Sequence, residues 1–218
     1  MASLTIENYA KAIYQISAAQ DNRSVATGQL AEALQVSPGT VTSMLKTLSE
    51  SGLADYIPYE GARLTDAGRS LALRVLRRHR LIELFLERTL HLPWDEVHAE
   101  AENMEHAVSD LLIDRIDAYL GYPASDPHGD PIPKADGTVA MAATCKLSQV
   151  VVGQRFRVAR VLDQSPEFLR YLSECSLQLG AEGVVAANRP EAGIVTLEVG
   201  GASTTLARDV ADRLLVMQ

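Results

Sequence analysis

The chain has 218 residues, of which 47% are hydrophobic and 22% charged, as in an ordinary globular protein with room for two or three domains. It contains no apolar run near twenty residues and no signal-peptide pattern, so we expect no membrane partner and a cytoplasmic location. Its two cysteines are too few for a disulfide framework. The net charge of −8 at first argues against a nucleic-acid partner.

That charge is unevenly distributed along the chain. Residues 1–82 carry nine Lys or Arg and seven Asp or Glu, residues 83–140 carry three and thirteen, and residues 141–218 carry eight of each. The first third is therefore mildly basic, and the acidity lies in one central segment. Because an acidic excess alone is typical of a solvated helix face, the spacing of these acids decides what they do.

The first third predicts a run of short helices. Residues 4–19 place Tyr9, Ile13 and Ile16 on one apolar stripe at helical spacing. Thr27 is expected to cap a second short helix. The third helix has clear boundaries, with Ser37 as its N-cap and Gly52 just past its end.

The third helix has a surface suited to DNA. It is small and polar and contains no carboxylate before Glu50, so it can approach phosphates and base edges without repulsion. Residues 53–58 and 62–64 then predict a hairpin, or wing, and Thr65 caps the next helix. This order predicts a winged helix-turn-helix domain, the alternative being a small helical bundle that binds a protein. The candidate DNA-binding residues are Thr27, Ser37, Pro38, Gly39, Thr40, Ser43 and Lys46.

The helix after Thr65 is strongly basic. Its arginines are Arg74, Arg77, Arg78 and Arg80. The sequence leaves open whether they contact the DNA backbone or pair with the acidic segment that follows.

The acidic segment contains a candidate metal cluster. His98, Glu102, Glu105 and His106 are spaced by three and four residues, which predicts one helical face. Like charges at this spacing destabilise a helix by ~0.2–0.5 kcal/mol per pair, so a bound cation would relieve the repulsion. Two carboxylates and an imidazole suit Mn²⁺ or Fe²⁺, and no cysteine is near enough to favour a closed zinc site.

A second group of candidate ligands precedes this cluster. His79 and Glu83 are four residues apart and could join His98 in a second metal site. The alternative is that each histidine is a surface or capping residue and that Glu102 is an ordinary solvated glutamate.

The last third is predicted to be a small β domain. The Pro-, Gly- and Asp-rich residues 123–137 indicate a loop, and β-rich runs follow from Gly153. A short helix is expected at Ser165–Ser173. Five strands around it would make a small barrel.

Six motifs carry a resemblance that covers the whole chain. They are ENYAKAIY, LQVSPGTVTSMLKTLSESGL, LTDAGRSLA, RRHRLIELFL, WDEVHAEAENMEHAVSD and HGDPIP. In this order they resemble the diphtheria toxin repressor family of iron- and manganese-dependent transcriptional regulators. The resemblance implies a mainly α protein with a small β domain. We expect a winged helix-turn-helix at 1–73, a helical metal-binding and dimerisation domain at 74–140, a linker at 141–152 and an SH3-like (FeoA-like) barrel at 153–218.

The resemblance also implies the ligands of two metal sites. The primary site falls on Asn8, Glu102, Glu105 and His106. The second site has two versions that share Glu83. One adds His79, His98, Gln164 and Glu167, and the other, of the streptococcal manganese type, adds Asp126, His128 and Asp163.

Three departures from the family pattern bear on the metal. Iron-responsive members have cysteine in place of Glu102 and methionine in place of Asn8, so oxygen ligands here favour Mn²⁺ over Fe²⁺. Manganese-responsive members usually have aspartate in place of Asn8. Members with two closely spaced metals have glutamate in place of Lys11, which argues against such a pair here. Co²⁺, Ni²⁺ or Zn²⁺ could activate the protein in vitro.

The sequence thus predicts a dimeric repressor that binds double-stranded operator DNA when loaded with Mn²⁺ and controls metal-homeostasis genes. The alternatives are an Fe²⁺-responsive repressor of iron-uptake genes, a DNA-binding protein regulated by something other than metal, and a metal-dependent enzyme. The enzyme reading is disfavoured because it leaves the helix-turn-helix unexplained, and no small organic substrate is expected.

Overall fold

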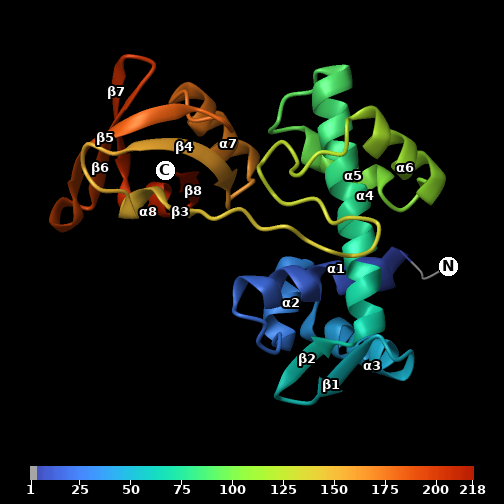
Figure 1. Cartoon of the computed structure of the whole chain (residues 1–218). Coiled ribbons are helices and arrows are strands. Elements are labelled where there is room, and N and C mark those ends of the chain that lie inside the picture. The colour runs from blue at the N-terminus through green and yellow to red at the C-terminus, as the bar shows by residue number, and fades with distance from the viewer. Residues whose placement is uncertain (1–3) are drawn as a thin grey trace. The chain divides into compact units, whose positions relative to one another are not determined.

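A computed structural model describes residues 4–218 as helices followed by a β domain (Figure 1). The chain forms two compact units. The first comprises Met1–His79, Glu105–Ala107 and Pro133–Thr138, and the second comprises the remaining residues. In the described part of the chain, no helix is long and apolar enough to cross a membrane.

The first unit begins with the three predicted helices, α1 (Leu4–Ala19), α2 (Thr27–Ala33) and α3 (Pro38–Glu50). Ser37 caps α3, since its side chain accepts a hydrogen bond from the Thr40 N–H. The expectation that Thr27 caps α2 is wrong, because Thr27 is the first helical residue and Ala26 is the N-cap. The Gln29 side chain accepts the Ala26 N–H instead, at 3.0 Å.

The predicted wing is a two-stranded antiparallel hairpin, β1 (Ala54–Ile57) and β2 (Gly61–Leu64). Gly61 is required where the hairpin meets Val25, because a Cβ there would lie 2.5 Å from the Val25 carbonyl oxygen and φ is +101°. Apolar side chains of α1, α3 and the hairpin form one core, which includes Ile13, Leu45 and Ala62. The core fixes the orientation of α3.

The long helix α4 (Asp66–Leu90) follows directly, with the Thr65 hydroxyl accepting the Gly68 N–H at 3.2 Å. The division between the two units falls inside this continuous helix, after His79. Two shorter helices come next, α5 (Val97–Met104) and α6 (Asp110–Tyr119).

The prediction that the four central ligands share one helical face is wrong. Helix α5 ends at Met104, and Glu105 and His106 lie in the turn that follows. The physical reason is the start of α6, where the Ser109 side chain accepts the Leu112 N–H and so begins a new helix.

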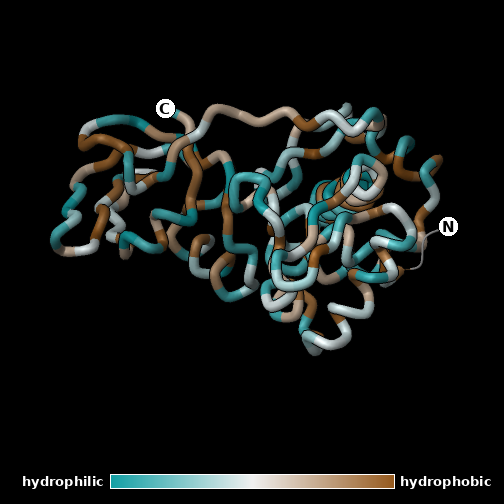
Figure 2. Tube along the Cα trace, turned by 90° about the horizontal axis from the view of Figure 1, so that it is seen from below, coloured by the Kyte–Doolittle hydropathy of each residue, from teal (hydrophilic) through white to brown (hydrophobic). Residues whose placement is uncertain are grey.

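The C-terminal part of the second unit is one antiparallel sheet in the order β3-β8-β4-β5-β6-β7. It therefore has six strands rather than the expected five. In Arg155–Val158 exposed and buried residues alternate, and hydrophobic and hydrophilic stretches are interspersed along the tube of this domain (Figure 2). The strands are β3 (Cys145–Lys146), β4 (Arg155–Val161), β5 (Glu182–Arg189), β6 (Ile194–Val199), β7 (Ala202–Ala207) and β8 (Leu214–Met217).

Strand β3 lies within the segment 141–152 that was expected to be a linker, and it pairs with β8. Leu147 and Val150 follow it and are fully buried in the core of the β domain. The remaining elements of this domain are the 3₁₀ turns η1 (Leu147–Gln149) and η2 (Pro190–Ala192) and the helices α7 (Pro166–Glu174) and α8 (Arg208–Asp212).

Candidate metal centre and DNA-binding surface

The candidate metal centre in the first unit is built around the carboxylate of Glu105, which is buried. Lys11, on α1, donates from Nζ to Glu105 Oε1 at 2.6 Å. His79, on α4, lies with Nδ1 2.6 Å from Glu105 Oε2. Both carboxylate oxygens thus have positively polarised partners from two different helices.

These contacts control the charge of Glu105. Burial raises the pKa of this carboxyl, but the hydrogen bond from His79, the charges of Lys11 and His79 and the Lys11 hydrogen bond outweigh burial. The net result is a pKa below that of an ordinary glutamate. Glu105 is therefore ionised although it is fully buried, and its carboxylate oxygens can bind a metal ion.

His106 is held next to Glu105 by a residue that the sequence analysis missed. Its Nδ1 lies 2.6 Å from Oε2 of Glu7, a buried glutamate on α1. A carboxylate only accepts, so Nδ1 is the donor and the neutral ring has its lone pair on Nε2. This Nε2 faces Glu105 Oε1 at 3.1 Å.

Two buried atoms of the expected primary ligands lack a hydrogen-bond partner among the residues that the structure describes. They are Asn8 Oδ1 and His106 Nε2. Both can bind a cation through a lone pair, and unsatisfied buried acceptors are costly. Together with ionised Glu105 they fit a divalent ion that accepts oxygen and nitrogen ligands.

The fourth expected ligand, Glu102, lies on the last turn of α5, three residues before Glu105. It is partly exposed, and Oε1 lies 3.8 Å from His98 Nε2. The Glu102 side chain is 38% exposed, compared with 10% for His106 and 0% for Glu105.

A second group of candidate ligands lies within the second unit. Glu83, Asp126 and His128 are all buried, and each offers one ligand atom within 4.8 Å of the others. His128 donates from Nε2 to the Trp94 carbonyl oxygen at 2.7 Å, which leaves Nδ1 as a lone-pair donor 3.9 Å from Glu83 Oε2. No hydrogen bond to this Nδ1 exists within residues 4–218.

The carboxylates of this second group repel one another. Burial first, and then the charges of Glu83 and Asp130, raise the pKa of Asp126 well above that of an ordinary aspartate, although Arg80 acts in the opposite direction. A cation among these groups would offset the repulsion.

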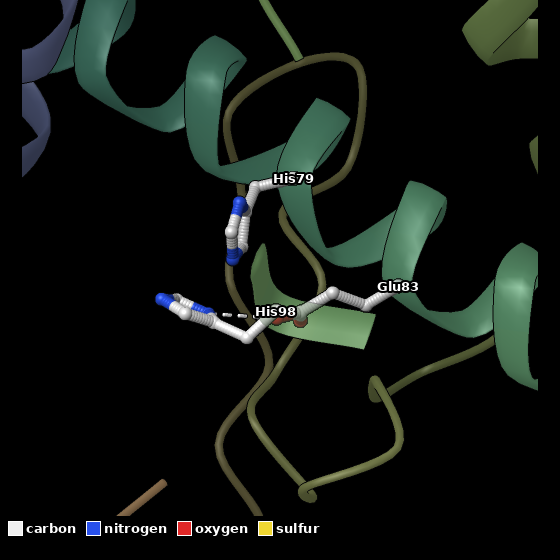
Figure 3. A group of neighbouring side chains, drawn as sticks. All are labelled: His79, Glu83 and His98. Carbon is white, nitrogen blue, oxygen red and sulfur yellow. Dashed lines mark hydrogen bonds and ion pairs between the residues drawn. The ribbon is translucent and has the colours of Figure 1, made fainter. Parts of the chain in front are cut away.

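The other version of the second site shares Glu83. Figure 3 shows that His79 and Glu83 project from successive turns of α4, with His98 of α5 next to Glu83. The His98 Nδ1 lies 3.1 Å from Glu83 Oε1, and the His98 side chain is 46% exposed.

Three residues expected in the second site make other contacts. Asp163 accepts from Arg213 at 2.8 Å and from the Ser165 N–H at 3.0 Å, and these bonds outweigh burial and lower its pKa. Gln164 donates to Asp130 at 3.1 Å. Glu167 is exposed and lies 3.4 Å from Arg170. None of the three belongs to the Glu83, Asp126 and His128 group in the described part of the chain.

The predicted DNA-binding residues surround the start and outer face of α3. All are exposed except Thr27, which is half-buried. The Ser37 hydroxyl is engaged in capping and also lies 2.8 Å from Thr40 Oγ1. A hollow between α3 and the wing is lined by Thr42, Lys46 and the fully exposed Tyr59. Neither Thr42 nor Tyr59 is among the predicted DNA-binding residues.

The structure answers one question about the basic helix. Arg80 is buried, donates to the Pro131 carbonyl oxygen and lies 3.4 Å from Asp130, so it pairs with the acidic segment. Arg74 is exposed and remains available to a phosphate.

Three family models match successive parts of the chain. Residues 1–62 match the iron dependent repressor N-terminal DNA binding domain, residues 65–134 its metal binding and dimerisation domain, and residues 145–218 the FeoA domain. The iron-dependent repressor IdeR of Mycobacterium tuberculosis (strain H37Rv) is 30% identical over 228 residues, which cover 97% of this chain and 96% of IdeR. The chain belongs to the iron-dependent repressor family.

Solved structures agree with this membership. A manganese-dependent transcriptional repressor in complex with manganese has a TM-score of 0.87 and 41% identity, covering 98% of this chain and 99% of that chain. ScaR with bound Zn²⁺ has a TM-score of 0.80 and 32% identity, covering 98% of this chain and 99% of that chain. The protein is thus a metal-dependent transcriptional repressor with the expected winged-helix, helical and SH3-like β domains, and its relatives are repressors rather than enzymes.

Proposed function

We propose that this family member is a Mn²⁺-activated repressor that binds operator DNA as a homodimer and controls genes of metal homeostasis. The donor set of the first centre supports Mn²⁺, because Asn8, Glu102, Glu105 and His106 offer only oxygen and nitrogen. Both cysteines lie in the C-terminal β domain, far along the chain from these ligands. Fe²⁺ is the alternative.

The single observation that carries the metal proposal is the pair of buried atoms without a hydrogen bond in the described residues, Asn8 Oδ1 and His106 Nε2. A divalent ion there would add two positive charges and a direct link between α1 and the Glu105–His106 turn. Asn8 lies on α1, so this link would restrain the helix that packs against the DNA-reading core.

The protein already ties α1 to the same turn without a metal ligand. Lys11 contacts Glu105 and Glu7 contacts His106, each at 2.6 Å. Contacts that need no metal therefore already join α1 to this turn. Activation adds a further restraint through Asn8 to a helix that is already attached.

For the second site we favour Glu83, Asp126 and His128. All three are buried, and the Trp94 carbonyl orients the His128 ring with Nδ1 toward Glu83. The version with His79 and His98 uses a more exposed imidazole and is the alternative.

The DNA-reading surface is proposed to be the outer face of α3 together with the wing. Its exposed Thr40, Ser43 and Lys46 carry few long base-reading groups, so DNA shape and methyl contacts would supply much of the specificity. Arg74 would contact a phosphate.

Operator binding under controlled metal tests the proposal. The probe is a duplex selected from a random library with the full-length protein and Mn²⁺, and binding is measured anaerobically in chelator, Mn²⁺ or Fe²⁺. We expect tight binding in Mn²⁺, loss in chelator, and loss of the Mn²⁺ response in Glu105→Gln combined with His106→Gln. Equal binding in chelator would contradict metal gating, and activation by saturating Fe²⁺ but not by Mn²⁺ would make iron the effector.

A further inference from the structure

The primary centre contains a lysine whose charge the proposed ligand set does not use. Lys11 is only 7% exposed, and its ammonium group lies 2.6 Å from Oε1 of the fully buried Glu105. Lysine is rarely buried unless its ammonium group is paired, because removing that charge from water is costly. The contact joins residues that are 94 positions apart in the chain.

Lys11 and the expected ligand Asn8 come from one face of the same helix. They are three residues apart on α1, and side chains at this spacing are neighbours. Helix α1 therefore carries, three residues apart, a neutral oxygen that can bind a metal and the ammonium group that contacts Glu105.

Both cations would use the same carboxylate oxygen. Glu105 Oε1 accepts from Lys11 and also lies 3.1 Å from His106 Nε2. A metal that joins His106 Nε2 to Glu105 Oε1 must therefore lie next to the Lys11 ammonium group or displace it. Glu105 Oε2 already has its own partner, since His79 Nδ1 lies 2.6 Å from it, and His79, Glu102 and Glu105 each offer one ligand atom within 4.8 Å of the others.

We propose that Lys11 is an internal competitor of the metal, which neutralises Glu105 when no metal is bound and thereby sets the metal concentration at which the repressor responds. The inference rests on the proposed function, since it assumes that Glu105 is a ligand. Like-charge repulsion in a buried site weakens metal binding, while the same ammonium stabilises the protein in chelator.

The test is to replace Lys11 by the uncharged, nearly isosteric methionine. We expect Lys11→Met to bind Mn²⁺ at least about ten-fold more tightly by calorimetric titration, since the competing charge is removed. In chelator the same variant melts at a lower temperature than wild type, because buried Glu105 loses the ammonium group that contacts Oε1. Added Mn²⁺ should then raise its melting temperature by more than it raises that of wild type.

Two control variants test whether the change in Mn²⁺ affinity arises at the contact between Lys11 and Glu105. Lys146→Met makes the same charge change at an exposed position in the C-terminal domain and should leave both measurements at wild-type values. Adding Glu105→Gln to Lys11→Met should abolish the gain in affinity, because the two residues act on one oxygen.

Unchanged or weaker Mn²⁺ binding by folded Lys11→Met would overturn the proposal and leave Lys11 a structural residue. If the variant does not fold in chelator, refolding with Mn²⁺ should rescue it, and failure in both conditions also counts against the proposal. Failure of the proposed function is a different result, in which the wild-type protein itself shows no Mn²⁺ binding that depends on Glu105 and His106.

Discussion

Glu7 shows how one side chain outside the expected ligand set can control a ligand. A metal-binding histidine needs its second nitrogen fixed, because the hydrogen bond of that nitrogen selects the tautomer and the ring orientation. Glu7 provides this bond to His106 Nδ1 from α1. The Trp94 carbonyl has the same role toward His128 Nε2 in the second group.

Replacing Glu7 by glutamine should therefore weaken metal binding without removing a ligand. The neutral amide still accepts from Nδ1–H but less strongly, and changes in such supporting residues typically cost 10–100-fold, so we expect about a 10-fold loss of Mn²⁺ affinity. Calorimetric titration measures this. Glu32→Gln, at an exposed site on α2, is the matched control. Wild-type affinity in Glu7→Gln would show that His106 is oriented by other contacts.

The sequence predicted which central residues offer atoms that can bind a metal, but not which of these side chains contact one another. His79 was assigned to the second site by its spacing from Glu83, whereas its imidazole also contacts Glu105 of the first centre. Lys11–Glu105 and Glu7–His106 link residues 94 and 99 positions apart. Helical spacing relates residues within a few turns and says nothing about such long-range pairs.

At the scale of elements, Ser37 and Ser43 have different roles although both belong to the predicted DNA-binding set. Ser37 caps α3, with its hydroxyl accepting the Thr40 N–H at 3.2 Å. Ser43 is exposed in the helix interior. Substituting each serine in turn therefore tests the stability of α3 and its contacts with DNA separately.

Ser37→Ala should lower the free energy of unfolding by about 1 kcal/mol, because the helix loses its N-cap. Ser43→Ala should leave stability unchanged or slightly higher, since alanine favours the helix interior, yet weaken operator binding. Urea unfolding and operator titration in Mn²⁺ measure the two effects. A stability loss in Ser43→Ala as large as that in Ser37→Ala would contradict this division.

Element boundaries were predictable where capping chemistry is local and failed where it is not. Ser37, Pro38 and Gly52 defined α3 correctly because each acts through its own backbone position. The end of α5 at Met104 was missed because helical spacing continues through His106. The sixth strand was missed because β3 has only two residues and depends on pairing with β8.

At the scale of the whole molecule, α6 has a face that the single chain does not bury. Ile113 and Ile116 enter the core of the helical region, whereas Leu111, Leu112 and Tyr119 are 69%, 48% and 70% exposed. These residues fall in the part of the chain that matches the metal binding and dimerisation domain. An exposed apolar face there suits a second copy of the chain.

Leu111→Glu should therefore separate dimerisation from metal binding. The charge would be buried in a homodimer but solvated in a monomer, so we expect a monomer by sedimentation that still unfolds in one cooperative thermal transition. Mn²⁺ affinity should also stay at the wild-type value, because all proposed ligands come from one chain. Operator affinity should fall at least about 100-fold, since two linked reading heads gain 10²–10⁴-fold over one. Val151→Glu, at a 63% exposed site in the C-terminal region, is the control. A Leu111→Glu dimer with intact operator binding would place the interface elsewhere.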